Sequence, residues 1–423
     1  RLSDRTVRTA VTVSATTTGR MPISSSRARR LRSTGFVADL VADAPHGHDR
    51  GRLAELAAHL AHVDVDRARL AEVGRSPDRL EQLVAAVHAP RARHQGGEDL
   101  ELDVGQVDRL AGAHRRDAAR QRGKLRGIGL ASYLEASGAG NAPKDQVQGH
   151  FNAQGQLEVH AVTGASGQGH ETSFSQIIER ELGLPAGLVS YRAGTVDSKK
   201  LVGNGTGGSR TLYGAGSAIL SLAQQLKAKV TALRAELGLA PTVDDWAGWI
   251  AGLSEDQRER LSAMGEASSG STFPNGCHVA EIEIDPQTGR TEVVQYWAVD
   301  DLGKVISPDL VRGQVHGGVI QGWGQAFCEQ VVYDEQGQLV TGSFMDYAMP
   351  RLGDMPIIRN ETIEVATGLN ALGSKGVGES GCTGSLPALS NAMMSVLRAY
   401  GVTGMDMPFT PAKVWAAINP ASS

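Results

Sequence analysis

The most informative stretches of the sequence are residues 300–326, DDLGKVISPDLVRGQVHGGVIQGWGQA, and Gly373–Gly381, GSKGVGESG, further along the chain. Asp300 and Asp301 resemble the polar end of a strand, and the apolar spacing over Ser307–Val331 predicts a helix despite its glycines. The second segment precedes another predicted helix. The first segment contains a Gly-rich loop, Gln314–Gly324 (QVHGGVIQGWG), and the second is itself one. Each is interpreted as lying next to a helix start, where backbone N–H groups can bind an anion.

Two further Gly-rich loops precede predicted helices, Gly164–Thr172 (GASGQGHET) and Gly203–Thr211 (GNGTGGSRT). Each loop alone is explained more simply as a tight turn or a helix cap. Four such loops, with Gln, Ser, Arg and Glu between the glycines, suit one large anionic ligand that all four loops contact. The sequence contains no G-x-x-x-x-G-K-[ST] motif and no G-x-G-x-x-G after a strand, which argues against a P-loop or Rossmann nucleotide site.

Hydrophobic spacing in the rest of the chain predicts hairpins, long helices and scattered strands. The predicted strands are Leu125–Glu135, the hairpin Gln146–His160, Val189–Ala193, Cys277–Ile284, Thr291–Val299 and Ile357–Thr367. The predicted helices are Ser173–Leu182, Thr211–Leu237, Val243–Gly252, Ser254–Met264, Ser385–Tyr400 and Pro411–Asn419. Without regular βαβ alternation, these elements indicate an α+β fold.

The chain changes character near residue 125. The preceding part holds about twenty arginines, seven of the twelve histidines and a single aromatic residue, Phe36. Two interpretations of residues 1–123 stay open: a helical domain, in which Arg52–Val73 is an amphipathic helix, or an Arg-rich segment that is frameshifted or poorly ordered. On neither do its histidines indicate a metal site. Residues 124–423 are expected to form the functional region.

Bulk composition excludes several classes of protein. The chain is 41% hydrophobic and 21% charged with a net charge of -4, which points to neither nucleic acid nor an anionic membrane. Its three cysteines form no C-x-x-C pair, which argues against an iron–sulfur or zinc site built by this chain alone. The sequence lacks a long apolar run and the apolar core of a signal peptide. We therefore expect a cytoplasmic protein.

Glu379, between Gly378 and Ser380, is the most suggestive acidic residue. A carboxylate in a dry glycine loop can have a raised pKa and act as a general base. A carboxylate just before a helix can instead be stabilised by the helix dipole. Spacing alone leaves both roles open.

Five motifs occur in a fixed order along the chain: GQGHET, GGSRT, the run over residues 300–326, SFMDYAMPR and SKGVGESG. Together they resemble the molybdopterin-binding large subunits of the xanthine oxidase family of molybdenum hydroxylases, which includes aldehyde oxidoreductases. GQGHET, GGSRT and KGVGES look most like carbon monoxide dehydrogenase-like large chains. The resemblance covers roughly residues 124–420 and implies molybdopterin-binding domains of the xanthine oxidase type.

This resemblance also implies roles for individual residues. Glu379 matches the family's general base. The residues expected to hold the pterin are Gln168, Gly169, Gly208, Ser209, Arg210, Thr211, Gln321, Lys375, Gly376, Val377 and Gly378. In the family the pterin dithiolene holds molybdenum, so no protein ligand to the metal is expected. The cofactor is expected to be molybdopterin or its cytosine dinucleotide.

The implied activity is insertion of water-derived oxygen into an aldehyde or N-heterocycle. Electrons would pass to an iron–sulfur small subunit and an FAD medium subunit. An aerobic carbon monoxide dehydrogenase-like large chain and a catalytically silent truncated or assembly chain are the alternatives. A complete large subunit is nearly twice as long, and its GGFGGK-like, F-R-G-x-G-like and active-site cysteine loops are absent here. We therefore expect a companion chain to supply that half, and the sequence does not identify the substrate.

Several other residues invite a catalytic role but are interpreted as structural. His170 is expected to pack within its loop, and His316 to be a helix residue. Asp300 and Asp301 are expected to end a strand rather than bind a metal. Trp246 and Trp249 are expected to anchor a small helical insertion.

Overall fold

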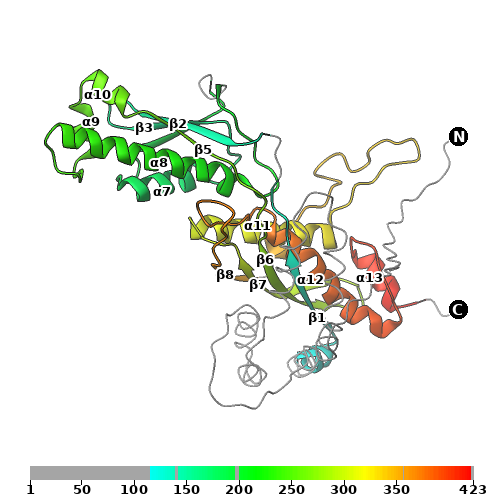
Figure 1. Ribbon diagram of the computed structural model, residues 1–423. Helices are drawn as coiled ribbons and strands as arrows, with labels where there is room; N and C mark the ends of the chain where they lie inside the picture. Colours follow the sequence, from blue (N-terminus) through cyan, green and yellow to red (C-terminus); the bar gives the residue numbers. More distant parts are fainter. Residues whose placement is uncertain (1–114, 139–141, 196–199, 356, 421–423) are drawn as a thin grey trace, which may run out of the picture. The chain divides into compact units, whose positions relative to one another are not determined.

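The computed structural model describes residues 115–138, 142–195, 200–355 and 357–420 (Figure 1). The predicted helix Arg52–Val73 and nearly all of residues 1–123 lie outside these ranges. Residues 115–121 are helical and lead into the first strand. Among the described residues, no helix combines the length and the apolar character needed to cross a membrane.

One four-stranded sheet has the order β1-β6-β7-β8. Its strands are β1 (Leu125–Leu134), β6 (Asn275–Ile284), β7 (Thr291–Asp301) and β8 (Ile358–Ile363). The first three are antiparallel neighbours, and β8 joins β7 in parallel. Arg115 and Arg122, which precede β1, form ion pairs with Glu281 and Glu283 of β6, so the short helix before β1 is attached to this sheet.

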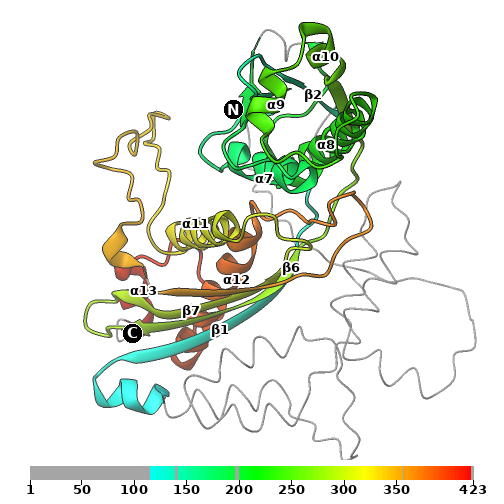
Figure 2. The same ribbon diagram turned by 90° about the vertical axis from the view of Figure 1, so that its left-hand side faces the viewer.

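Helices α11 (Pro308–Phe327) and α12 (Ser380–Leu397) lie on one face of this sheet (Figures 1 and 2). They share an apolar core with β6, β7 and α13 (Pro411–Ile418). Glycines let the backbones approach closely: a Cβ on Gly322 of α11 would lie 1.8 Å from Ser385 Oγ of α12, and one on Gly129 of β1 would lie 2.1 Å from the carbonyl oxygen of Ala388. Gly318, Gly322 and Gly324 of α11 are therefore packing positions rather than helix breaks.

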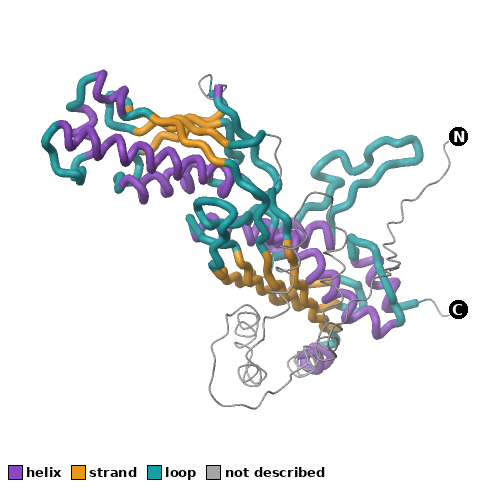
Figure 3. The backbone as a smooth tube through the Cα atoms, in the orientation of Figure 1, coloured by secondary structure: helices purple, strands orange, loops and turns teal. Residues whose placement is uncertain are grey.

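The second sheet has the order β4-β3-β2-β5, and Figure 3 shows its strands as a separate set. Its strands are β2 (Asp145–Phe151), β3 (Leu157–Ala161), β4 (Val189–Ala193) and β5 (Ala263–Ala267). The pairs β2–β3 and β2–β5 are antiparallel, and β3–β4 is parallel. Helices α7 (His170–Leu182) and α8 (Thr211–Glu236) share the apolar core of this sheet.

Short elements complete the described chain: α9 (Trp246–Ala251), α10 (Glu255–Arg260) and the 3-10 turns η4 (Leu352–Asp354) and η5 (Arg398–Tyr400). Trp246 is buried against Phe151, and its indole N–H donates to the carbonyl of Gly183. Trp249 lies under the Arg234 guanidinium. Both tryptophans therefore anchor this small helical region, as the sequence predicted.

The α+β class and most predicted elements are confirmed, but several boundaries are wrong. Helix α11 ends at Phe327 rather than Val331, β8 ends at Ile363 rather than Thr367, and α9 begins at Trp246 rather than Val243. The helix predicted over Ser254–Met264 ends at Arg260, and strand β5 follows it. Ser254 does cap α10, because its hydroxyl accepts from the backbone N–H of Gln257. Helix α12 begins at Ser380 rather than Ser385, which brings its N-terminus directly to Glu379.

Candidate functional site

The second and fourth Gly-rich loops meet through Ser209 and Glu379. The Ser209 hydroxyl donates to Glu379 Oε2 at 2.9 Å, and the backbone N–H of Glu379 donates to Ser209 Oγ at 3.0 Å. A Cβ on Gly376 would lie 2.7 Å from the carbonyl oxygen of Ser209, so the two backbones are in close contact. Ser209 has φ 58°, the one positive φ at a non-glycine position among the described residues. Such strain is commonly found at functional sites.

Residues in the first turns of α11 contact the first and the fourth Gly-rich loops. Gly169, the left-handed residue that starts α7, is so close to Leu310 that a Cβ would lie 2.6 Å from its Cδ2 atom. Gln314, one turn further along α11, has its Oε1 atom 3.7 Å from where a Cβ of Gly378 would stand. Three of the four predicted loops are therefore linked through the first turns of α11 and the start of α12. The third, Gln314–Gly324, was wrongly predicted as a loop, because it lies inside helix α11.

Glu379 occupies the N-cap position of α12, but its side chain makes no capping hydrogen bond. Its carboxylate turns to Ser209 instead. The side chain is exposed, and within the described ranges its Oε1 atom receives no hydrogen bond. Of the two roles left open by the sequence, the geometry favours a carboxylate oriented by a neighbouring loop, with one oxygen available to accept a proton.

Arg210 is tied to Asp145 in a buried ion pair. Its two terminal nitrogens reach the two oxygens of Asp145 at 3.3 and 2.5 Å, and the side chains are 7% and 2% exposed. Asp145 also accepts from the backbone N–H of Asn204 at 2.9 Å. The guanidinium thus fastens the 203–211 loop to β2. Any anion bound by this loop has to be held by backbone N–H groups and hydroxyls.

Lys375 also forms a largely buried ion pair with an aspartate. Its Nζ atom donates to Asp301 Oδ2 at 2.6 Å, and this side chain is 11% exposed. Asp301 also accepts from the backbone N–H groups of Gly303 and Val365. Asp301 is therefore a structural acceptor for three donors, and Lys375 fixes the 373–381 loop on the end of β7.

Two features of these loops show whether a large polar cofactor fits them: buried polar atoms without a hydrogen-bond partner, and glycines with free space beside the backbone. Thr211 Oγ1 and Glu135 Oε1 are buried without a hydrogen-bond partner in the described part of the chain, and such groups normally have one. A Cβ on Gly205 or Gly207 would meet nothing within 4 Å, and the same holds for Gly167. The residues present therefore fit a ligand that approaches the loop backbones and supplies hydrogen bonds.

Glu135 is a site residue that sequence reasoning missed. It follows β1 and accepts a hydrogen bond from Ser380 Oγ at 3.3 Å. Burial raises the pKa of its carboxyl, the hydroxyl of Ser209 opposes that shift, and the negative charge of Glu379 adds to it. In the sequence Glu135 was only the last residue of a predicted strand, so nothing local indicated that it lies beside the start of α12.

The two glutamines of the predicted set differ in position. Gln168 accepts from the backbone N–H of Ser166 and stays within its own loop. Gln321 lies exposed on α11, two turns beyond Gln314 on the same side of the helix. Gln314 is thus the glutamine that lies beside the loop of Glu379, and the sequence analysis did not single it out. Val377 is half-buried against the core of the first sheet.

The residues interpreted as structural have protein partners. His170 is buried against Phe174, and burial lowers its pKa. Asp300 is buried and accepts from Tyr133 at 2.7 Å, with the His278 ring nitrogen Nε2 at 3.1 Å. These contacts support packing roles for both predicted structural residues.

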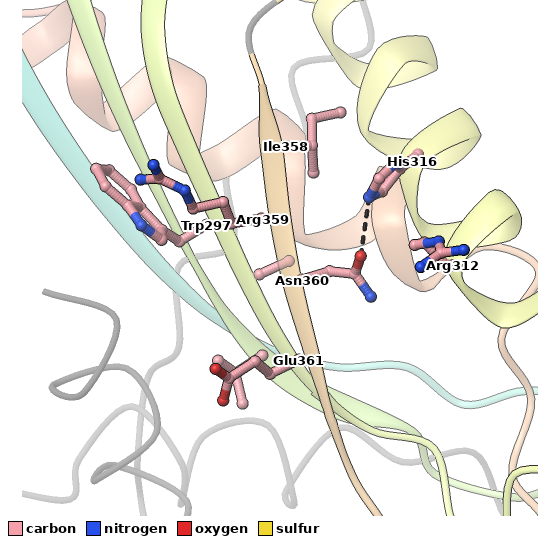
Figure 4. Close-up of a pocket in the computed structure, with 9 residues that line it drawn as sticks. Trp297, Arg312, His316, Ile358, Arg359, Asn360 and Glu361 are labelled. Atoms are coloured by element: carbon pink, nitrogen blue, oxygen red, sulfur yellow. Dashed lines mark hydrogen bonds between the residues drawn. The ribbon is translucent and has the colours of Figure 1, made fainter. Parts of the chain in front are cut away.

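His316 lies within 2.8 Å of Asn360 Oδ1, between α11 and β8 (Figure 4). The two residues line a pocket of about 390 Å³, whose wall also includes Trp297, Arg312 and Glu361. None of the predicted cofactor residues lines this pocket.

Comparison with known proteins gives a consistent result. The family model for the molybdopterin cofactor-binding domain matches residues 106–356. The chain is 32% identical over 347 residues to the nicotine 6-hydroxylase large subunit of Paenarthrobacter nicotinovorans, covering 73% of this chain and 42% of that protein. It is 29% identical over 337 residues to the carbon monoxide dehydrogenase large chain of Hydrogenophaga pseudoflava, covering 70% and 41%.

A solved structure agrees with these sequence matches. Quinoline 2-oxidoreductase from Pseudomonas putida 86 superposes with a TM-score of 0.66 at 31% identity, over 75% of this chain and 44% of that one. The chain therefore spans less than half the length of the relatives it matches.

Proposed function

The chain belongs to the molybdopterin cofactor-binding domain family, and we propose that it is the cofactor-binding part of a molybdenum hydroxylase large subunit, with Glu379 as general base. The proposed reaction inserts water-derived oxygen into an aldehyde or an N-heterocycle. The observation that carries the proposal is the contact of the second and fourth Gly-rich loops at one carboxylate, Glu379, which the Ser209 hydroxyl orients beside the first turns of α11.

The cofactor would be held by the backbones and hydroxyls of these loops. Gln168 and Gly169 would contact the pterin from the start of α7, and Gln321 from α11. Gly208, Ser209, Arg210 and Thr211 would hold its phosphate-bearing end, and the unpartnered Thr211 hydroxyl supports this assignment. Lys375, Gly376, Val377 and Gly378 would form the loop beneath the metal. When bound, the molybdenum–pterin group supplies the two-electron redox centre for oxidation of the substrate carbon.

Glu379 would accept a proton on its Oε1 atom while the Ser209 hydroxyl holds Oε2. Fixing one oxygen restricts rotation of the carboxylate, which suits proton transfer at a fixed place. Glu135 lies near enough for the charge of Glu379 to raise its pKa, so the protonation state of Glu135 would influence Glu379 in return.

The remaining parts of the enzyme would come from other chains. Because this chain spans less than half of its relatives, a companion chain or segment would supply the substrate side of the site. An iron–sulfur small subunit and an FAD medium subunit would carry the electrons away. The three cysteines are unpaired, which supports a cytoplasmic location and leaves iron–sulfur ligation to a partner. The cytosine dinucleotide form of molybdopterin is the proposed cofactor variant.

Turnover by the chain purified with its companion chains tests the proposal. Aldehydes, N-heterocycles and carbon monoxide are offered in turn with an artificial electron acceptor, and molybdenum per chain is measured on the same sample. The proposal expects molybdenum together with turnover of an aldehyde or N-heterocycle. Turnover of carbon monoxide alone would instead support the carbon monoxide dehydrogenase alternative, which the relative from Hydrogenophaga pseudoflava favours. Bound molybdenum with no turnover would establish the catalytically silent chain.

A further inference from the structure

Three metal-ligating side chains gather on the β2–β3 hairpin, in residues that the proposed molybdenum site does not use. His150 of β2 is directly opposite Glu158 of β3, and His160 follows Glu158 by two residues. Because side chains alternate along a strand, all three project from the same face. The other face carries Val147, Val159 and the rest of the apolar core, so this polar face is the outer one.

The three groups converge at their free atoms. Nε2 of His150 and Nε2 of His160 each lie 3.9 Å from Glu158 Oε2. The two imidazole rings are nearly parallel, at 4°, with centroids 5.7 Å apart. The side chain of His160 is only 10% exposed, so its position is fixed by packing, whereas those of His150 and Glu158 are 41% and 29% exposed and can adjust.

In Glu158 and His160, the atom that does not face the cluster already has a hydrogen-bonding partner. Asn152 donates to Glu158 Oε1 at 3.0 Å, which leaves Oε2 to face the histidines. Nδ1 of His160 lies 3.3 Å from Thr195 Oγ1, and a proton on Nδ1 leaves the lone pair on Nε2. Partners of this kind orient the ligands of natural metal sites.

We propose that His150, Glu158 and His160 bind one divalent transition-metal ion of the zinc type across the β2–β3 hairpin. Two imidazole nitrogens and one carboxylate oxygen suit zinc, nickel or copper, whereas magnesium and calcium prefer oxygen ligands throughout. Ligands at about 2.0–2.1 Å in a tetrahedral site are roughly 3.4 Å apart, so each 3.9 Å separation needs to close by about 0.5 Å. Solvent would complete the coordination. The ion would join the two strands independently of the molybdenum cofactor.

Arg192 is the competing cation. It pairs in register with His160 on β4 and is exposed, so its positive charge lies on the strand next to the proposed ligands. A bound dication would have to displace this charge from the carboxylate. Arg192→Gln is therefore expected to tighten zinc binding, while a cluster without metal-binding function would give no such change.

Zinc binding by the whole chain tests the proposal. The protein is stripped with a chelator and titrated with zinc, with magnesium as the comparison, while bound equivalents and Tm are measured. The histidines of residues 1–123 can also bind zinc, so the decisive quantity is the difference between wild type and His150→Asn or Glu158→Gln. Gln148→Ala is the matched control, because Gln148 lies on the same face of β2 and offers no comparable ligand.

The expected result is one fewer zinc equivalent in each ligand variant and no loss in the control. Zinc at about a hundredfold above its Kd should raise the Tm of wild type by roughly 4–8 °C, and that of the ligand variants by much less. Circular dichroism verifies that the variants fold, and Glu158→Gln keeps the size of the side chain. Equal zinc uptake by wild type and both ligand variants would overturn the proposal, as would an equal response to magnesium.

Discussion

Asp145 is predicted to hold the second Gly-rich loop in place, and Asp145→Ala tests this. The substitution leaves the Arg210 guanidinium, which is 7% exposed, buried without a counter-charge. It also removes the acceptor for the backbone N–H of Asn204. Breaking a buried ion pair by removing one partner typically destabilises a protein by about 3–5 kcal/mol. The free energy of unfolding should fall by about that amount.

Urea denaturation followed by circular dichroism measures this change. Glu266→Ala is the matched control, because Glu266 pairs with Lys144 in the same part of the sheet but both side chains are well exposed. Solvent screens such a pair, so the control should leave stability almost unchanged. A loss for Asp145→Ala no larger than that of the control would refute the view that this ion pair fastens the loop.

Two further substitutions test the packing and the electrostatics of the site. Gly129→Ala places a Cβ 2.1 Å from the backbone of α12 and should lower the free energy of unfolding, measured with urea, by about 1–3 kcal/mol. Gly270→Ala is the control, because a Cβ there meets nothing within 4 Å and should leave stability unchanged. Equal effects of the two substitutions would contradict the close packing. Burial raises the pKa of Glu135 in the folded chain above its ordinary 4.5, so its stabilising contribution is present below that pH and is lost as pH rises through the folded value. Glu135→Gln should therefore stabilise the chain relative to wild type more at pH 7 than at pH 4, and a pH-independent difference in melts would contradict this reasoning.

Much of the fold was predictable because its signals are local. The turn of the β2–β3 hairpin, the limits of β4 and the start of α8 follow from alternation, Gly and helix periodicity within each segment. The number and composition of the Gly-rich loops predicted that they lie close together, and the contacts of Ser209 with Glu379 and of Gly169 with Leu310 agree with this for three of them.

The features that escaped prediction depend on partners distant in sequence. Strand β5 follows α10 with no strong alternation and forms because β2 supplies its hydrogen-bonding edge. Helix α12 begins five residues early despite Gly381 and Pro387, since a close fit of Gly381 against α11 compensates for weak helix propensity. The pairing of Glu135 with Ser380, and the position of Gln314 beside Gly378, likewise arise only in the folded chain.

Glu379→Gln, examined in the complex with companion chains, tests the central claim most directly. The amide can still accept from the Ser209 hydroxyl, so the loop geometry and the molybdenum content per chain should match those of wild type. Loss of a general base should lower turnover with an artificial electron acceptor by about 10²–10⁴-fold. Equal molybdenum with turnover within tenfold of wild type would contradict the assignment of Glu379 as the base.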